Sequence, residues 1–123
     1  MTFLQLARIA EKVIADTQRR LPADIREPAS GVPVCFEPRP NDDILAEGLE
    51  PDILGLFVGP SHSEDPGAAE PLPSQVLLFL ENIWDFAEDD EAVYRDEVRI
   101  TYLHELGHYL GLDESDLEAR GLD

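Results

Sequence analysis

The sequence is poor in cysteine, in basic residues and in long apolar runs. Cys35 is the only cysteine among 123 residues, so the chain cannot form an internal disulfide and does not read as a disulfide-stapled secreted domain. We expect this one thiol to be buried and structural. No apolar run approaches the roughly 20 residues that a membrane-spanning helix needs. Charged Arg8, Glu11 and Lys12 also break any signal-peptide pattern at the N-terminus. We therefore expect a cytoplasmic protein that does not enter a membrane.

The shortage of basic residues gives the chain a strongly acidic balance. Lys and Arg number 9 against 27 for Asp and Glu, and the formal net charge is −18. A chain of this charge repels nucleic acid and anionic membrane surfaces, so a role on either is excluded. The same charge attracts cations and basic peptides. Among possible peptide or protein partners, basic ones are therefore favoured.

The length and the hydrophobic pattern predict one α+β domain. A chain of this size can bury its own core, and we expect residues 1–123 to form a single domain. Thr2 and Gln5 fit a capping box at the start of a helix over the first twenty residues, which Pro22 ends. The other expected elements are strands at 31–37, 52–58 and 76–80, a turn or short helix at 82–86, a long helix from 89–91 to 110, and a short helix near 115.

In one long segment the hydrophobic residues follow neither the helical nor the strand period. Residues 59–74 are rich in Pro, Gly, Ser and acid, which predicts an exposed loop that could flank a cleft. His62 lies in this segment, and we interpret it as an ordinary exposed loop histidine. Trp84, by contrast, is expected to belong to the core.

The residues that carry chemistry lie in the long C-terminal helix. His104, Glu105 and His108 form an H-E-x-x-H motif. Residues four apart lie one turn apart on one helical face, so both imidazoles can reach one metal ion. Glu105 lies about 100° further round the helix, where it can approach an open position on the metal without binding it. A carboxylate there can take a proton from a zinc-activated water, which makes Glu105 the candidate general base.

The helical wheel separates a core face from the face of the motif. Taking about 100° per residue, an apolar arc opposite the histidines should be buried; it contains Val98, Tyr102, Leu103, Leu106, Tyr109 and Leu110. Thr101 and Glu97 fall on the histidine side. Either could hydrogen-bond the imidazole nitrogen that does not bind metal, or could be solvated surface.

A catalytic zinc site needs a third protein ligand. Gly111 follows His108 by three residues and permits a sharp turn that returns the chain toward the metal. Glu114 comes three residues later, and Asp113 and Asp116 are close by. We favour Glu114 as the ligand and leave both aspartates open. We expect one zinc ion per chain, held by His104, His108 and the acidic residue.

These residues give the chain a resemblance to a known family. The stretch from Glu97 to Leu117, with its H-E-x-x-H-x-x-G-x-x-E pattern, resembles the zincin-like metallopeptidases, specifically a small single-domain bacterial family of minimal zincins. The segments 55–59 and 78–80 are similar to strands of that family. The resemblance implies a zincin-like α+β fold with an N-terminal helix, a small mixed β-sheet and a long metal-binding helix near the C-terminus. It also implies zinc on His104, His108 and Glu114, with Glu105 as base.

The motif also resembles that of the metzincins, with two departures. The third ligand is an acid where most metzincins have histidine, and no Met-turn can form because Met1 is the only methionine. The chain also ends nine residues after Glu114, so we expect no C-terminal subdomain to wall the cleft. The first interpretation is a zinc metallopeptidase, a hydrolase of peptide bonds. The alternatives are a zinc-stabilised binding or chaperone-like module without turnover, and a metal-dependent hydrolase of a small amide or ester. Tyr94, Tyr109, His62 or an arginine could stabilise the oxyanion, and the sequence does not choose among them.

Overall fold

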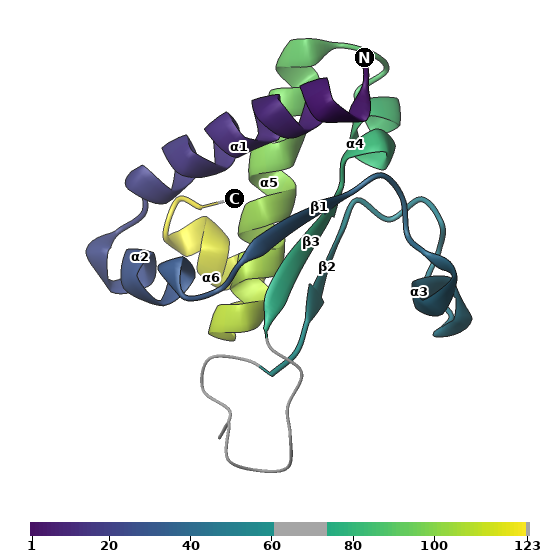
Figure 1. Cartoon of the computed structure of the whole chain (residues 1–123). Helices are drawn as coiled ribbons and strands as arrows, with labels where there is room; N and C mark the ends of the chain where they lie inside the picture. Colours follow the sequence, from purple (N-terminus) through teal and green to yellow (C-terminus); the bar gives the residue numbers. More distant parts are fainter. Residues whose placement is uncertain (61–73, 123) are drawn as a thin grey trace.

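The computed structural model describes residues 1–60 and 74–122, and these residues form an α+β fold (Figure 1). The helix α5 stands at the centre of the view, with the sheet on one side, α6 on the other and α1 across its upper half. The helices and strands are α1 Phe3–Arg19, α2 Ala23–Ser30, β1 Val34–Glu37, α3 Asp42–Ala46, β2 Gly55–Val58, β3 Gln75–Phe79, α4 Leu80–Phe86, α5 Glu91–Leu110 and α6 Glu114–Ala119. None of the described helices combines the length and the apolar character that crossing a membrane requires.

The N-terminal helix α1 is confirmed with its predicted cap. The Thr2 side chain accepts a hydrogen bond from the Gln5 backbone N–H, and the Gln5 side chain accepts one from the Thr2 N–H, which completes the capping box. Leu6, Ala10 and Ile14 are buried at helical spacing. Phe3 and Val13 are half-buried at the edges of this face.

The three described strands form a mixed sheet in the order β1-β3-β2. β1 runs parallel to β3, and β2 runs antiparallel to it, with Gly55 opposite Leu78. Pro33 immediately precedes β1, an edge strand, where its missing N–H costs no ladder hydrogen bond. In the central strand β3, Val76 and Leu78 are fully buried, whereas Leu77 between them is half-exposed. The second face of the sheet is therefore only partly covered.

The long helix α5 is also confirmed, together with its end. The Asp90 side chain caps its first turn by accepting from the Val93 N–H. Gly111 ends the helix with a φ of 72°, the left-handed conformation that glycine adopts without steric cost. Val98, Tyr102, Leu103 and Leu106 are buried as predicted, and Tyr94 joins them in the core, while Tyr109 and Leu110 are half-buried.

Two helices and the environment of the cysteine differ from the sequence expectations. α2 and α3 were not predicted, because each is short: α2 buries only Ile25 and Ala29 and contains a proline, and α3 buries no residue at all. Cys35 was expected to be buried, but it lies half-exposed on the edge strand β1, where its thiol donates to Gln75 Oε1 at 3.2 Å. An edge strand leaves such a side chain covered on one side only.

Candidate metal centre

The two histidines of the motif stand side by side on the solvent side of α5. The ring centroids of His104 and His108 are 4.9 Å apart, with the rings inclined at 63°. Their side chains are 42% and 52% exposed, so both are accessible to an ion from solvent. The one-turn spacing predicted from the sequence therefore brings the two imidazoles together.

Glu105 directly follows His104 in the sequence, but it is much more buried than the two histidines. Its side chain is only 9% exposed, and its Oε1 lies 3.4 Å from Nδ1 of His108. The carboxylate thus points to the same side as the imidazoles while its stem is covered by protein. A side chain held in this way has few alternative rotamers, which fixes where its oxygen atoms stand.

Gly55 on β2 makes the burial of Glu105 possible. A Cβ atom at position 55 would stand 2.7 Å from Cγ2 of Thr101 and 3.2 Å from Cγ of Glu105. Only glycine allows the strand to approach α5 so closely. Our interpretation of the sequence gave Gly55 no role in the site, although a glycine inside a strand pattern is the signal that marks such an approach.

Glu114 reaches the histidines from the other side of the turn at Gly111. Its Oε1 lies 3.9 Å from Nδ1 of His104, and its side chain is 88% exposed. Asp113 and Asp116 are engaged elsewhere: each side chain accepts the backbone N–H of the other, which forms a capping box at the start of α6. Among the three acids considered from the sequence, the structure therefore brings Glu114 to the histidines and uses the two aspartates as helix caps.

A close contact between helices holds α6 in place. Leu117 is buried beside Gly107, where a Cβ atom would stand 3.1 Å from Leu117 Cδ1. The backbone N–H of Leu112 donates to the Gly107 carbonyl at 2.8 Å, and Arg120 pairs with Asp24 of α2 at 3.0 Å. The glycine between the two histidines thus leaves the space that Leu117 fills.

The two histidines and Glu114 line an open hollow of about 440 Å³. Its lining consists of His104, His108, Gly111, Leu112, Asp113, Glu114 and Leu117. Within residues 1–60 and 74–122, no three His, Cys, Asp or Glu side chains already stand as a metal-binding group. The donor set nevertheless fits zinc, since two imidazoles and one carboxylate are ligands that it favours. Because the Glu114 side chain is exposed, rotation about its side-chain bonds can bring its carboxylate to an ion held by the two histidines.

Thr101 and Glu97, for which the sequence left open a hydrogen bond to the histidines or a solvated position, do not bond the imidazoles. Thr101 is buried against Gly55, and no hydrogen bond joins Thr101 or Glu97 to either imidazole, all four being described residues. Partial burial raises the pKa of Glu97, and the charge of Asp96 adds to this, while Arg99 opposes it. Glu97 is therefore a half-buried carboxylate about two turns before His104 on α5.

The candidates for stabilising an oxyanion are reduced by one. Tyr94 is fully buried, and its hydroxyl donates to the Leu6 carbonyl at 2.9 Å, so it belongs to the core between α5 and α1. Burial also raises the pKa of its phenol. Tyr109 is half-buried with its ring 5.8 Å from that of Phe57. His62 lies outside the described residues.

Comparison with known proteins gives one family match. Residues 29–122 match the family described as zincin-like metallopeptidase. The match includes the three strands, α5 and α6, and therefore all the candidate site residues, whereas α1 lies outside it. No curated protein matches the chain.

Proposed function

Because the chain belongs to the zincin-like metallopeptidase family, we propose that it is a zinc-dependent peptidase that uses Glu105 as general base. The observation that carries this proposal is the placement of Glu105. Its carboxylate is buried beside His108, on the same helix as two exposed imidazoles. A site that served only to hold zinc for stability would not need a second carboxylate that does not bind the metal.

We assign the metal to His104, His108 and Glu114. The imidazoles lie on one face of α5, and the carboxylate is delivered by α6 across the Gly111 turn. Three protein ligands would leave one position free, as catalytic zinc sites require. When bound there, zinc would polarise the scissile carbonyl and lower the pKa of the attacking water.

Glu105 would carry the proton transfers. Its carboxylate takes a proton from the water as the water attacks, and then delivers that proton to the leaving amine. The contact with Gly55 matters here, because it holds the stem of Glu105 between β2 and α5. A base fixed in this way does not have to be ordered when substrate binds.

The strand β2 suggests how a peptide would be held. It pairs with β3 along one edge, and along its other edge it pairs with no strand among the described residues. An extended peptide can add to such an edge through main-chain hydrogen bonds. Because Gly55 of this strand contacts Glu105, a peptide on β2 would lie beside the base. The net charge of −18 would favour basic peptides.

Glu105→Gln is the test of this function. The amide keeps the size of the side chain but cannot take a proton from water, so turnover should fall at least about a hundredfold. Zinc content and melting temperature should stay close to those of the wild type. The assay is cleavage of a mixed peptide library that includes basic sequences, followed by mass spectrometry. Glu91→Gln, at the opposite end of α5, is the matched control and should keep full activity.

Two results would overturn the proposal. Cleavage that survives in Glu105→Gln would come from another base or from a contaminating protease. Zinc-loaded wild type that cleaves no peptide, and that captures partners as well as Glu105→Gln does, would instead favour a binding module.

A further inference from the structure

A second hollow lies on the side of α5 away from the histidines. It has a volume of about 470 Å³ and is bounded by the C-terminal half of α1, the middle of α5 and the segment that follows α6. Volumes of roughly 300–1,000 Å³ are typical of small-molecule sites. Its lining residues are Val13, Asp16, Thr17, Arg20, Leu21, Arg95, Asp96, Arg99, Leu103, Gly121 and Leu122.

This hollow is distinct from the metal centre. Arg99 precedes His104 by five residues, which places the two side chains roughly 140° apart around the helix. Leu122 lines this hollow and also a smaller one of about 220 Å³ beside His104 and Glu114, so it stands between them. A ligand in the larger hollow would therefore not occupy the place proposed for the peptide.

The floor of the hollow is apolar. Leu21 and Leu103 are buried at its base, and Val13 and Leu122 are half-buried around them. Surface of this kind favours the hydrocarbon part of a ligand, because covering it removes apolar area from water.

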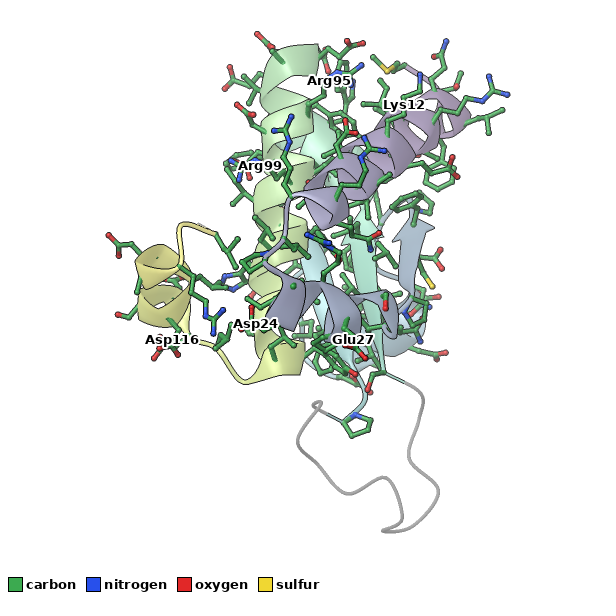
Figure 2. All side chains as sticks on the ribbon, turned by 90° about the vertical axis from the view of Figure 1, so that its left-hand side faces the viewer. Lys12, Asp24, Glu27, Arg95, Arg99 and Asp116 are labelled. Carbon is green, nitrogen blue, oxygen red and sulfur yellow. The ribbon has the colours of Figure 1, made fainter. Side chains whose placement is uncertain are left out.

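The rim is basic, in contrast to the rest of the chain. Three of only nine basic residues line it, namely Arg20, Arg95 and Arg99. Figure 2 looks onto this face: the labelled basic residues Lys12, Arg95 and Arg99 lie in its upper part, and the labelled acids of α2 and α6 lie in its lower part.

Two of these arginines have no ion-pair partner among the described residues, although the charge of Arg99 acts on Glu97 at longer range. Arg95 pairs with Glu91 at 3.4 Å, and the lining acid Asp16 pairs with Arg19. The side chains of Arg20 and Arg99 form no ion pair or hydrogen bond with any described residue, even though the chain contains 27 acids. Asp96 remains as an acid at the rim. The guanidinium group forms its strongest hydrogen bonds as a fork onto a carboxylate or a phosphate.

We propose that this hollow binds a small amphipathic anion, with a carboxylate or phosphate head group on Arg20 and Arg99 and an apolar body over Leu21 and Leu103. The basic rim and the apolar floor together favour such a ligand over a cation or a sugar. The site does not depend on zinc or on the proposed peptidase activity.

Octanoate is the probe that we would use, because it joins a carboxylate to a short hydrocarbon chain. It is titrated into the full-length protein while backbone amide shifts are recorded by NMR. We expect saturable shifts at Thr17, Leu21, Leu103 and Gly121. Octyl phosphate distinguishes the two head groups, and the one that binds more tightly identifies the anion. Octylamine, with the opposite charge on the same chain, should not shift these amides.

Substitution of the arginines separates this site from general hydrophobic binding. Arg20→Gln with Arg99→Gln should weaken octanoate binding about tenfold or more, since hydrogen bonds to charged groups are lost. Arg8→Gln removes an exposed charge from α1 outside the hollow and should change nothing. Shifts confined to other residues, equal binding of octylamine, or full affinity in the double variant would each overturn the proposal.

Discussion

Neighbouring acids of the same chemistry have different tasks in the turn after α5. Asp113 and Asp116 accept each other's backbone N–H groups, so their carboxylates are used in starting α6. Glu114 lies between them in the sequence and makes no such bond; its carboxylate faces His104 at 3.9 Å. A longer side chain on the first helical residue can reach across to α5, whereas a capping side chain must stay at its own helix end.

Zinc affinity should therefore respond to Glu114 and not to the charge of Asp113. We expect Glu114→Ala to weaken zinc binding by about one to two orders of magnitude or more, the lower end being the scale of changes around metal ligands. Asp113→Asn is the control, because asparagine also caps helices well while removing the charge. Competition with a chromogenic chelator measures both. A larger loss in Asp113→Asn than in Glu114→Ala would mean that Asp113 is the ligand.

The candidate site could be located from the sequence only in part. The positions of His104, Glu105 and His108 follow from helical spacing, which is local. The burial of Glu105 does not, because it depends on Gly55, which is fifty residues earlier and meets α5 only in the folded chain. The roles of the two aspartates were also missed, since Asp113 and Asp116 fit an N-cap as well as a ligand pattern until the start of α6 is known.

At the scale of elements, the contact between β2 and α5 positions Glu105, the proposed base. Gly55 and Phe57 point to the same face of the strand, as alternate residues do. Gly55 meets Thr101 and Glu105, and Phe57 meets Tyr109 one turn further along the helix. The stripe of residues four apart on α5 thus runs beneath the edge strand.

Gly55→Ala should disturb this contact. The added Cβ would stand 2.7 Å from Thr101 Cγ2, so we expect a loss of about 1–3 kcal/mol in the free energy of unfolding, as for other overpacked sites. Urea unfolding followed by circular dichroism measures it. Thr101→Ser removes the methyl group concerned, and in the double variant it should restore part of the stability lost in Gly55→Ala. If the effects of the two substitutions on stability are strictly additive, the contact with Thr101 is not the cause of the stability lost in Gly55→Ala.

The elements that could be predicted are those with a long hydrophobic period or a clear cap. α1 and α5 have both, and the three strands have apolar runs bounded by turns. α2 and α3 have neither: Ile25 and Ala29 are a single helical repeat, and α3 is held by its Asn41 cap without burying a side chain. Their formation depends on the surrounding fold, which a local pattern does not record.

At the scale of the whole molecule, the two histidines of the candidate metal centre and the core residues of α5 lie on opposite sides of the helix. The histidines are about half-exposed, while Tyr94, Val98 and Tyr102 of the same helix are fully buried. The fold therefore does not depend on the imidazoles for its packing.

Removing both imidazoles should thus separate metal binding from folding. We expect purified wild type to contain about one zinc per chain, and His104→Ala with His108→Ala to contain none. The melting temperature of the zinc-free double variant should lie within a few degrees of that of zinc-free wild type, as for surface substitutions in general. Elemental analysis and calorimetry are the measurements. Full zinc occupancy in the double variant would place the metal elsewhere.

The attachment of α6 has a consequence for how tightly the chain can hold a metal. A helix of six residues is not stable alone. It stays in place because Leu117 fills the space beside Gly107 and because Arg120 pairs with Asp24. If Glu114 is a ligand, α6 must be docked on α5 before the metal can be fully coordinated. The measured zinc Kd is then the intrinsic Kd divided by the fraction of molecules in which α6 is docked. Zinc in turn favours the docked state. Once the undocked state dominates, each further loss of about 1.4 kcal/mol in the free energy of docking should weaken zinc binding tenfold. A residue as remote as Asp24 would then help to set the metal affinity.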